Sequence, residues 1–149
     1  MGVTVTGVDE LISALRAMGE RLDTSTGHAV EAAQEMIEGQ ARAKLSQYSH
    51  QPNTPTPSPP GAPPALITGR LRSSFQIAGP TSDGAGVWMS VMGPTTVYAR
   101  IQELGGVAGR GHRSRLPARP YLRPAVESAL QSGQILDGFV RAWARALHG

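Results

Sequence analysis

The sequence predicts an α+β fold in which a small antiparallel sheet packs against a long amino-terminal helix and a carboxy-terminal helix. Three observations support this. Apolar residues recur at three- and four-residue intervals before residue 50, alternate with polar residues between 75 and 92, and return to helical spacing after 124. The 149 residues match one ordinary domain, so we expect a single domain, 1–149, with two mobile loops.

The first 50 residues are expected to form a strand and two helices. Valine and threonine alternate over 3–5, which is typical of a short strand. A short amphipathic helix is expected over 8–18, ended by Gly19. A longer helix then starts at Thr24 or Ser25, either of which can cap it. Its apolar stripe consists of Val30, Ala33, Ile37, Ala41, Leu45 and Tyr48.

The first mobile loop is a proline-rich arm over 51–64. It holds seven of the 12 prolines and can form neither a helix nor a central strand. Apolar sequence on both sides makes it either a long loop within one domain or a boundary between two domains. Neither flank is long enough to look self-sufficient, which favours the loop.

The middle of the chain predicts a β-hairpin between two short helices. The first helix is expected over 68–71, followed by a β segment over 75–78. A turn over 79–84, rich in Gly and Pro, leads to a second strand over 87–92. The second helix is expected over 97–104, where a pair of glycines ends it.

Glycine and arginine dominate residues 107–116, which we expect to form the second mobile loop, a basic one. Prolines then hold 117–124 extended, and Pro124 is suited to be the first residue of a final helix. The apolar face of that helix consists of Val126, Leu130, Leu136, Phe139, Trp143 and Leu147.

The composition indicates a thin hydrophobic core and an uneven charge. Only 5% of residues are aromatic, which makes the chain a candidate for stabilisation by neighbouring subunits. Residues 1–50 carry a net charge of −3 and 51–149 a net charge of +6. All but one of the 14 basic residues are arginine, which suits bidentate contacts with carboxylates or phosphates. This asymmetry fits nucleic-acid contact or head-to-tail packing of identical subunits.

Sequence signatures of chemistry are missing. The chain has no cysteine, its four histidines stand far apart, and it contains no Gly-x-Ser-x-Gly or phosphate-binding loop motif. We therefore expect no enzymatic activity, no catalytic residues, no cofactor and no metal. It also lacks the pattern of a signal peptide or a membrane span, so we expect synthesis in the cytoplasm and no membrane contact.

Three segments carry a resemblance to a known family. They are Thr-Gly-Arg-Leu-Arg-Ser-Ser at 68–74, Tyr-Ala-Arg-Ile-Gln-Glu-Leu-Gly at 98–105, and Pro-Ala-Arg-Pro-Tyr-Leu-Arg-Pro-Ala at 117–125. Together they resemble the tail-completion, or head–tail joining, proteins of siphophages of the lambdoid Hong Kong phage type. The order and spacing of the segments, the long amino-terminal helix and the total length match that family across nearly the whole chain.

The resemblance implies a structural α+β subunit, several copies of which form a ring, best a hexamer, at the neck of the virion. The implied partners are further copies of the chain, a head-closure or adaptor protein, and tail-terminator and tail-tube proteins. Non-specific contact with DNA in the channel is a further option. The protein would be made in the host cytoplasm and reside in the virion. Head closure and tail termination stay open as alternative roles, because small ring proteins of similar size fill them.

The three segments and the basic loop supply the candidate interface residues. Glu103 is expected to pair with an arginine, Arg119 or Arg123, within the subunit or across a subunit boundary. The candidates are Arg70, Arg72, Tyr98, Glu103, Arg110, Arg113, Arg115, Arg119, Tyr121 and Arg123.

A second hypothesis is a basic nucleic-acid-binding module that acts through Arg110, Arg113 and Arg115. A flexible arginine cluster can follow phosphates whatever the base sequence. However, the loop has no interleaved aromatic residues for base stacking, which favours a loop that forms salt bridges between subunits.

Overall fold

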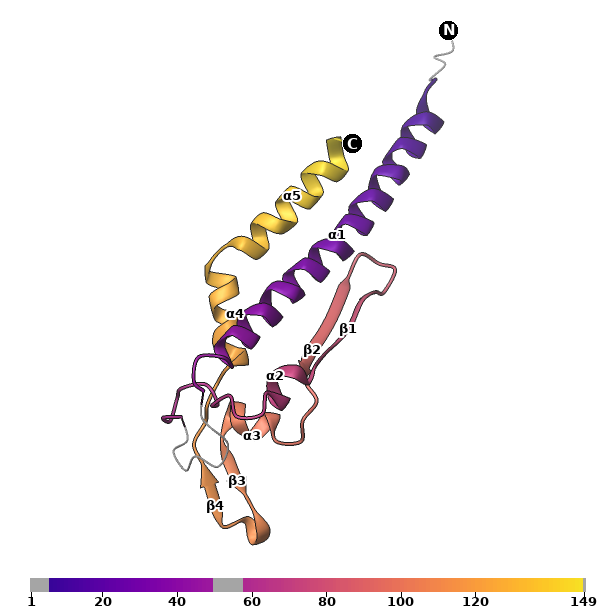
Figure 1. The fold of residues 1–149 in the computed structure, drawn as a ribbon. Coiled ribbons are helices and arrows are strands. Elements are labelled where there is room, and N and C mark those ends of the chain that lie inside the picture. The colour runs from indigo at the N-terminus through magenta and orange to yellow at the C-terminus, as the bar shows by residue number, and fades with distance from the viewer. Residues whose placement is uncertain (1–5, 50–57, 149) are drawn as a thin grey trace.

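The structure, a computed structural model, describes residues 6–49 and 58–148 (Figure 1). One helix, α1, runs from Val8 to Lys44 over 37 residues. At 1.5 Å per residue it is about 56 Å long. The other elements lie along its carboxy-terminal part, and its amino-terminal end projects beyond them (Figure 1). The α+β class and the long amino-terminal helix are confirmed.

The two helices expected before residue 50 are one continuous helix. Gly19 does not end it, because a glycine costs about 1 kcal/mol relative to alanine but keeps its backbone N–H in the ladder. Thr24 does not cap a new helix: its hydroxyl donates to the Glu20 carbonyl at 2.9 Å. The Ser25 hydroxyl donates to the Ala142 carbonyl, also at 2.9 Å. Both side chains thus find acceptors without interrupting the helix.

The expected antiparallel hairpin is formed by β1 (Phe75–Ser82) and β2 (Trp88–Pro94). Both strands are longer than expected. Gly79-Pro80, assigned to the turn, lies inside β1, where the register shifts between paired strands. The actual turn is stabilised by the Asp83 carboxylate, which accepts a backbone N–H bond from Ala85 at 2.8 Å. A two-stranded sheet is marginally stable alone, so it needs a cover.

Helix α1 provides that cover. Trp88 of β2 and Gln34 of α1 make the contacts between them. The Trp88 ring lies against Gly27, where an added Cβ would stand 2.8 Å from the ring. Its indole N–H donates to the Asp23 carboxylate at 2.8 Å. Farther along the helix, the Gln34 amide donates to the Val91 carbonyl at 3.1 Å. One face of the hairpin is therefore fixed on α1.

The buried core lies where α1 ends and meets α2 (Arg70–Ser73), α3 (Ala99–Leu104) and α4 (Leu122–Gln131). The rings of Phe75 and Tyr121 meet edge to face, with centroids 6.4 Å apart. The core members are Ala41, Leu45, Leu71, Phe75, Ala99, Tyr121 and Ala125.

The described part of the proline-rich arm packs on the subunit. The Gly61 N–H donates to the Ala118 carbonyl at 3.0 Å. A parallel bridge between Ser49 and Leu66 holds the two ends of the arm side by side. The earlier residues of the arm, and the strand expected at 3–5, lie outside the described residues.

The second expected loop is a hairpin, formed by β3 (Gly106–Ala108) and β4 (Ser114–Leu116). A short 3₁₀ turn, η1 (Arg110–His112), connects the strands. The segment is thus paired rather than an irregular loop, because low apolar content does not prevent pairing: an antiparallel ladder needs only backbone groups. We call residues 106–116 the basic finger. It lies at the end of the molecule opposite the amino terminus of α1 (Figure 1).

The single final helix expected from Pro124 is two helices, α4 and α5 (Gln134–His148), and Pro124 is the third residue of α4. Gly133 separates them with a φ of 72°, a left-handed conformation that favours glycine. This break lets α5 run antiparallel to α1 at its side (Figure 1).

Polar contacts fix α5 on α1. The Trp143 indole donates to the Thr26 hydroxyl at 2.9 Å. The Arg21 guanidinium donates to the Ala146 carbonyl at 3.1 Å, near the end of α5. Because Arg21 lies beside the last turn of α5, the amino-terminal turns of α1 extend past α5 (Figure 1). We call residues 8–15 the α1 projection.

Candidate assembly surfaces

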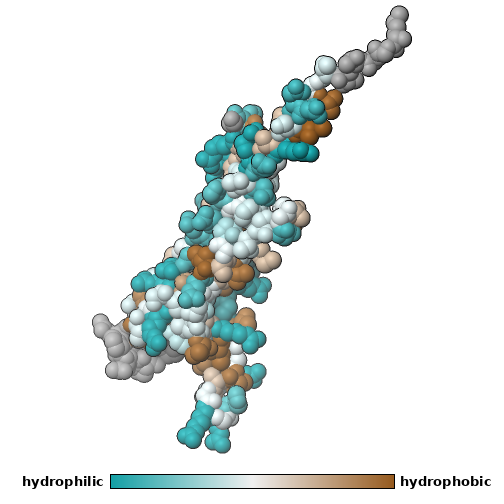
Figure 2. All heavy atoms as spheres, turned by 90° about the vertical axis from the view of Figure 1, so that its right-hand side faces the viewer, coloured by the Kyte–Doolittle hydropathy of each residue, from teal (hydrophilic) through white to brown (hydrophobic). Residues whose placement is uncertain are grey.

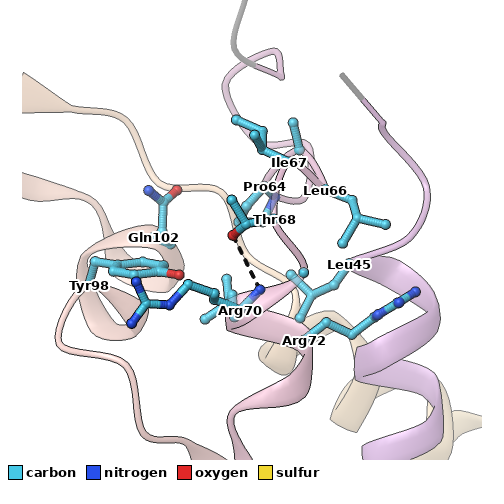
Figure 3. A pocket seen from close by; sticks show the side chains of 12 residues that line it. Leu45, Pro64, Leu66, Ile67, Thr68, Arg70, Arg72, Tyr98 and Gln102 are labelled. Atoms are coloured by element: carbon cyan, nitrogen blue, oxygen red, sulfur yellow. Dashed lines mark hydrogen bonds between the residues drawn. The ribbon is translucent and has the colours of Figure 1, made fainter. Parts of the chain in front are cut away.

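A surface pocket of about 270 Å³ brings together three predicted interface residues, Arg70, Arg72 and Tyr98 (Figure 3). In Figure 3 Arg70 points toward Tyr98, whereas Arg72 points toward the end of α1. There the Arg72 guanidinium donates to the Ser46 hydroxyl at 2.9 Å. Ile67, half-exposed, contributes apolar surface. The pocket can therefore accept an apolar side chain that is flanked by an acidic group.

Glu103 joins α3 to the start of α4. Its carboxylate accepts backbone N–H bonds from Tyr121 at 2.8 Å, Leu122 at 3.0 Å and Arg123 at 2.8 Å. The first N–H groups of a helix have no partner within the helix, and a negative charge there also stabilises the helix dipole. Glu103 thus acts as a remote cap. Within the subunit it does not form the expected ion pair with Arg119 or Arg123.

The two arginines proposed as partners of Glu103 bind elsewhere. Arg119 is buried, and its guanidinium donates to the Ser58 carbonyl at 3.0 Å. Arg123 is exposed and pairs with Glu127 at 2.9 Å. The hydrogen bond to Glu127 and the charge of that carboxylate raise the pKa of Arg123. Arg119 is therefore part of the fold, whereas Arg123 is free to face a partner.

Tyr121 lies inside the subunit rather than on its surface, with 1% of its area exposed. Its phenol O–H lies 3.5 Å from the Ala99 carbonyl. Burial raises the pKa of the Tyr121 phenol, and the nearby Glu103 carboxylate raises it further. The extended motif around Tyr121 therefore builds the core.

The basic finger places Arg110, Arg113 and Arg115 at the surface, together with His112. No acidic residue occurs between Glu103 and Glu127, so all charged side chains in and around the basic finger are positive. Pocket and finger are separate surfaces. The finger suits an anionic partner, either a carboxylate-bearing protein or phosphates.

Two apolar stripes are exposed that the sequence did not indicate as surfaces. One follows the α1 projection. The other follows one side of α5, next to the face that packs on α1, and includes Trp143, which also contacts Thr26 of α1. Figure 2 shows hydrophobic side chains gathered at the amino-terminal end of α1. Their helical spacing is the only signal in the sequence, and it is the same for a core and for an interface. The stripes consist of Val8, Leu11, Ile12 and Leu15 on α1, and Leu136, Val140, Trp143 and Leu147 on α5.

Within residues 6–49 and 58–148, no group of three or more histidine, aspartate or glutamate side chains could hold a metal ion. Over the same ranges no helix has the length and apolar character needed to cross a membrane.

An elongated subunit with exposed apolar stripes and a basic finger has the features of a component of a larger assembly. The comparison with known families identifies which kind. The model of the phage virion morphogenesis family matches residues 4–139, and the chain belongs to this family. It is thus a protein of phage virion assembly, which confirms the phage part of the expectation. No curated protein and no solved structure matches the chain.

Proposed function

We propose that the chain is a tail-completion protein, a structural subunit of a ring that joins the DNA-filled head to the tail. The observation that carries this proposal is the imbalance between core and surface. Among the described residues, the buried hydrophobic set contains nine residues, five of them alanine, whereas 19 large hydrophobic side chains are exposed. Monomeric proteins rarely expose contiguous apolar surface of this kind, so assembly must cover much of it.

A ring is the assembly that the resemblance to tail-completion proteins implies. Exposed apolar stripes on two different elements are compatible with it, because a head-to-tail contact between unlike surfaces forms a ring where the rotation closes. The ring faces would then meet a head-closure or adaptor protein on one side and tail-terminator or tail-tube proteins on the other. The pocket at Arg70 and Tyr98 and the basic finger supply candidate contacts for them. Six copies suit the resemblance best.

The proposal is tested in phage that lacks the gene. We expect infected cells to accumulate DNA-filled heads and separate tails, counted by electron microscopy, and plasmid-borne protein to restore joined particles. Joined, infectious particles without the protein would refute the neck role. If heads alone fail to fill, or if tails alone are missing, the role lies in head closure or in tail assembly instead.

Light scattering of the purified protein tests the ring directly. We expect a species near six times the 15.7 kDa chain mass, either alone or in the presence of neck and tail-terminator proteins. A strictly monomeric protein across micromolar concentrations in both conditions would contradict a ring.

A second candidate function is DNA contact through the basic finger, which the three exposed arginines favour. Neutralising phosphates releases counterions, so such binding should weaken steeply with salt. We expect Arg110→Gln, Arg113→Gln and Arg115→Gln together to lower DNA retardation uniformly across sequences. A matched variant, Arg16→Gln with Arg141→Gln and Arg145→Gln, removes equal charge elsewhere. No retardation at low salt, or equal losses in both variants, would dispose of this function.

A further inference from the structure

We propose that the surface at the base of the basic finger binds an acidic segment of another virion protein, one in which apolar side chains lie between the carboxylates. This inference deepens the proposed function, because it names the chemistry of a partner that the ring would meet. We call this surface the finger-base surface. It consists of Val97, Arg100, Ile101, Leu104, Val107 and Arg115.

The floor of the finger-base surface is apolar. Val97 is fully exposed, Leu104 is 64% exposed and Val107 is 50% exposed. All three line one surface pocket of about 340 Å³, formed by α3, β3 and the turn before α3. Figure 2 shows hydrophobic side chains beside the basic finger, at the end of the molecule opposite the amino terminus of α1. The floor can therefore receive an apolar side chain of a partner.

Backbone contacts fix the junction that carries this floor. The Gly105 N–H donates to the Ile101 carbonyl at 2.9 Å, and the Arg119 N–H donates to the Gln102 carbonyl at 2.7 Å. Gly105 also lies so close to the returning chain that an added Cβ would stand 2.7 Å from the Ala118 nitrogen. The finger is thus held on α3 in one arrangement, so a partner needs to order little of this surface when it binds.

The rim of the finger-base surface is basic. Arg100 lines the pocket itself. Arg115 pairs with Val107 in the β3–β4 ladder, so their side chains leave the same face of the finger. Among the residues that the structure describes, neither arginine has a carboxylate within salt-bridge distance. Glu103, the one carboxylate of α3, caps α4 instead. The rim therefore selects a partner that carries carboxylates.

An apolar floor inside a basic rim favours a protein partner over DNA. Protein interfaces commonly place an apolar centre inside a polar or charged rim. Phosphates need the arginines alone, and a phosphate packed against Val97 or Leu104 would lose water without gaining a hydrogen bond. A protein segment can instead place carboxylates on the rim and an apolar side chain in the pocket.

Net charge favours another protein over a second copy of the chain. The chain has a net charge of +3, and its residues 51–149 have a net charge of +6. A second copy would thus bring net positive charge to a positive surface, at a cost in repulsion. In the proposed ring, the finger-base surface is therefore left for a head-side or tail-side protein.

Photo-cross-linking in infected cells tests the proposal. Cells infected with phage that lacks the gene produce the chain from a plasmid, with a benzophenone amino acid at Val97. This side chain is fully exposed, so folding should be unaffected. Ala85, exposed in the turn of the first hairpin, is the matched control position. We expect a product at Val97, several-fold above Ala85. Mass spectrometry should map it to a segment of another virion protein in which Asp or Glu flanks a large apolar residue.

Substitutions in the finger-base surface test the chemistry of the contact. Leu104→Ser removes part of the floor, and Arg100→Glu with Arg115→Glu reverses the rim. Each change should lower the yield of the cross-linked product several-fold, while circular dichroism of the purified variants stays unchanged. Arg16→Glu with Arg141→Glu makes the same change in net charge elsewhere and should leave the yield unaltered. Equal losses in the two charge variants would overturn the role of the rim.

The mapped product separates this inference from its rivals and from the proposed function. A product with DNA, with a second copy of the chain, or with a segment that lacks Asp and Glu would overturn the proposal. No product above the Ala85 control would overturn it as well. Joined, infectious particles without the protein would refute the neck role, yet an acidic partner segment at Val97 would still establish the docking surface.

Discussion

The Glu103 carboxylate accepts a hydrogen bond from the Tyr121 backbone N–H at 2.8 Å, across 18 residues of chain. The contact joins α3, the basic finger and α4, because the finger leaves α3 and returns just before α4. With Leu122 and Arg123 as further donors, one side chain satisfies three N–H groups of the first turn. It thereby sets where α4 begins.

We expect Glu103→Ala to lower the free energy of unfolding by about 1–3 kcal/mol, since it leaves the part-buried N–H groups of Tyr121 and Leu122 without a protein acceptor. The matched control is Glu127→Ala, which removes a carboxylate from an exposed pair on α4 and should change stability little. Urea unfolding followed by circular dichroism measures both. Equal losses in the two variants would contradict the capping role.

Alkaline pH should destabilise the protein through Tyr121. The pKa of its phenol is raised in the folded state, so the unfolded chain loses this proton first as the pH rises above about 10. The contribution of the neutral phenol is therefore complete below about pH 10 and is lost above it, by at most about 1.4 kcal/mol per pH unit. Tyr121→Phe removes the dependence. We expect the stability difference between wild type and this variant to change only above about pH 10, in urea titrations at stepped pH. A constant difference up to pH 11 would contradict the prediction.

Gly27→Ala should destabilise the hairpin contact, although alanine is the better helix former. The new Cβ would stand 2.8 Å from the rigid Trp88 ring and displace it from Asp23. Gly39→Ala is the control, because nothing lies within 4 Å of its Cβ, and it should stabilise α1 by about 0.5–1 kcal/mol. Thermal unfolding and tryptophan fluorescence report the two effects. Stabilisation by both substitutions would show that the Trp88 ring is loosely held.

Gly105→Ala should be strongly destabilising. Gly105 has a φ of 69° with a ψ of −175°, a region that only glycine occupies readily. An added Cβ would also stand 2.7 Å from the Ala118 backbone nitrogen. Gly84→Ala shares the positive φ, 78°, but has open space around its Cβ, so it should cost only about 1 kcal/mol. The soluble yield of the two variants and the midpoints of their urea unfolding curves measure the difference. Similar losses would mean that the close approach at Gly105 relaxes without cost.

The candidate site was only partly predictable. The 68–74 and 98–105 segments do form one pocket, through Arg70 and Tyr98. The sequence could not show that Arg119 and Tyr121 lie inside the subunit, because proline-spaced polar and aromatic residues occur both in cores and at interfaces. Nor could it show that Glu103 binds backbone N–H groups, since a carboxylate attracts a guanidinium equally well.

The sequence by itself determined the α+β class, the helical face of α1, the first hairpin and the phage character of the chain, because these follow from local periodicity and short motifs. Only the tertiary structure decided that α1 continues through Gly19, that the basic segment is a paired finger, and that Gly133 divides the last helix. It also decided which apolar stripes are left uncovered. The physical reason is that periodicity defines a face but not its neighbour. Here the last turn of α5 lies beside Arg21, so the stripe from Val8 to Leu15 is exposed on the subunit.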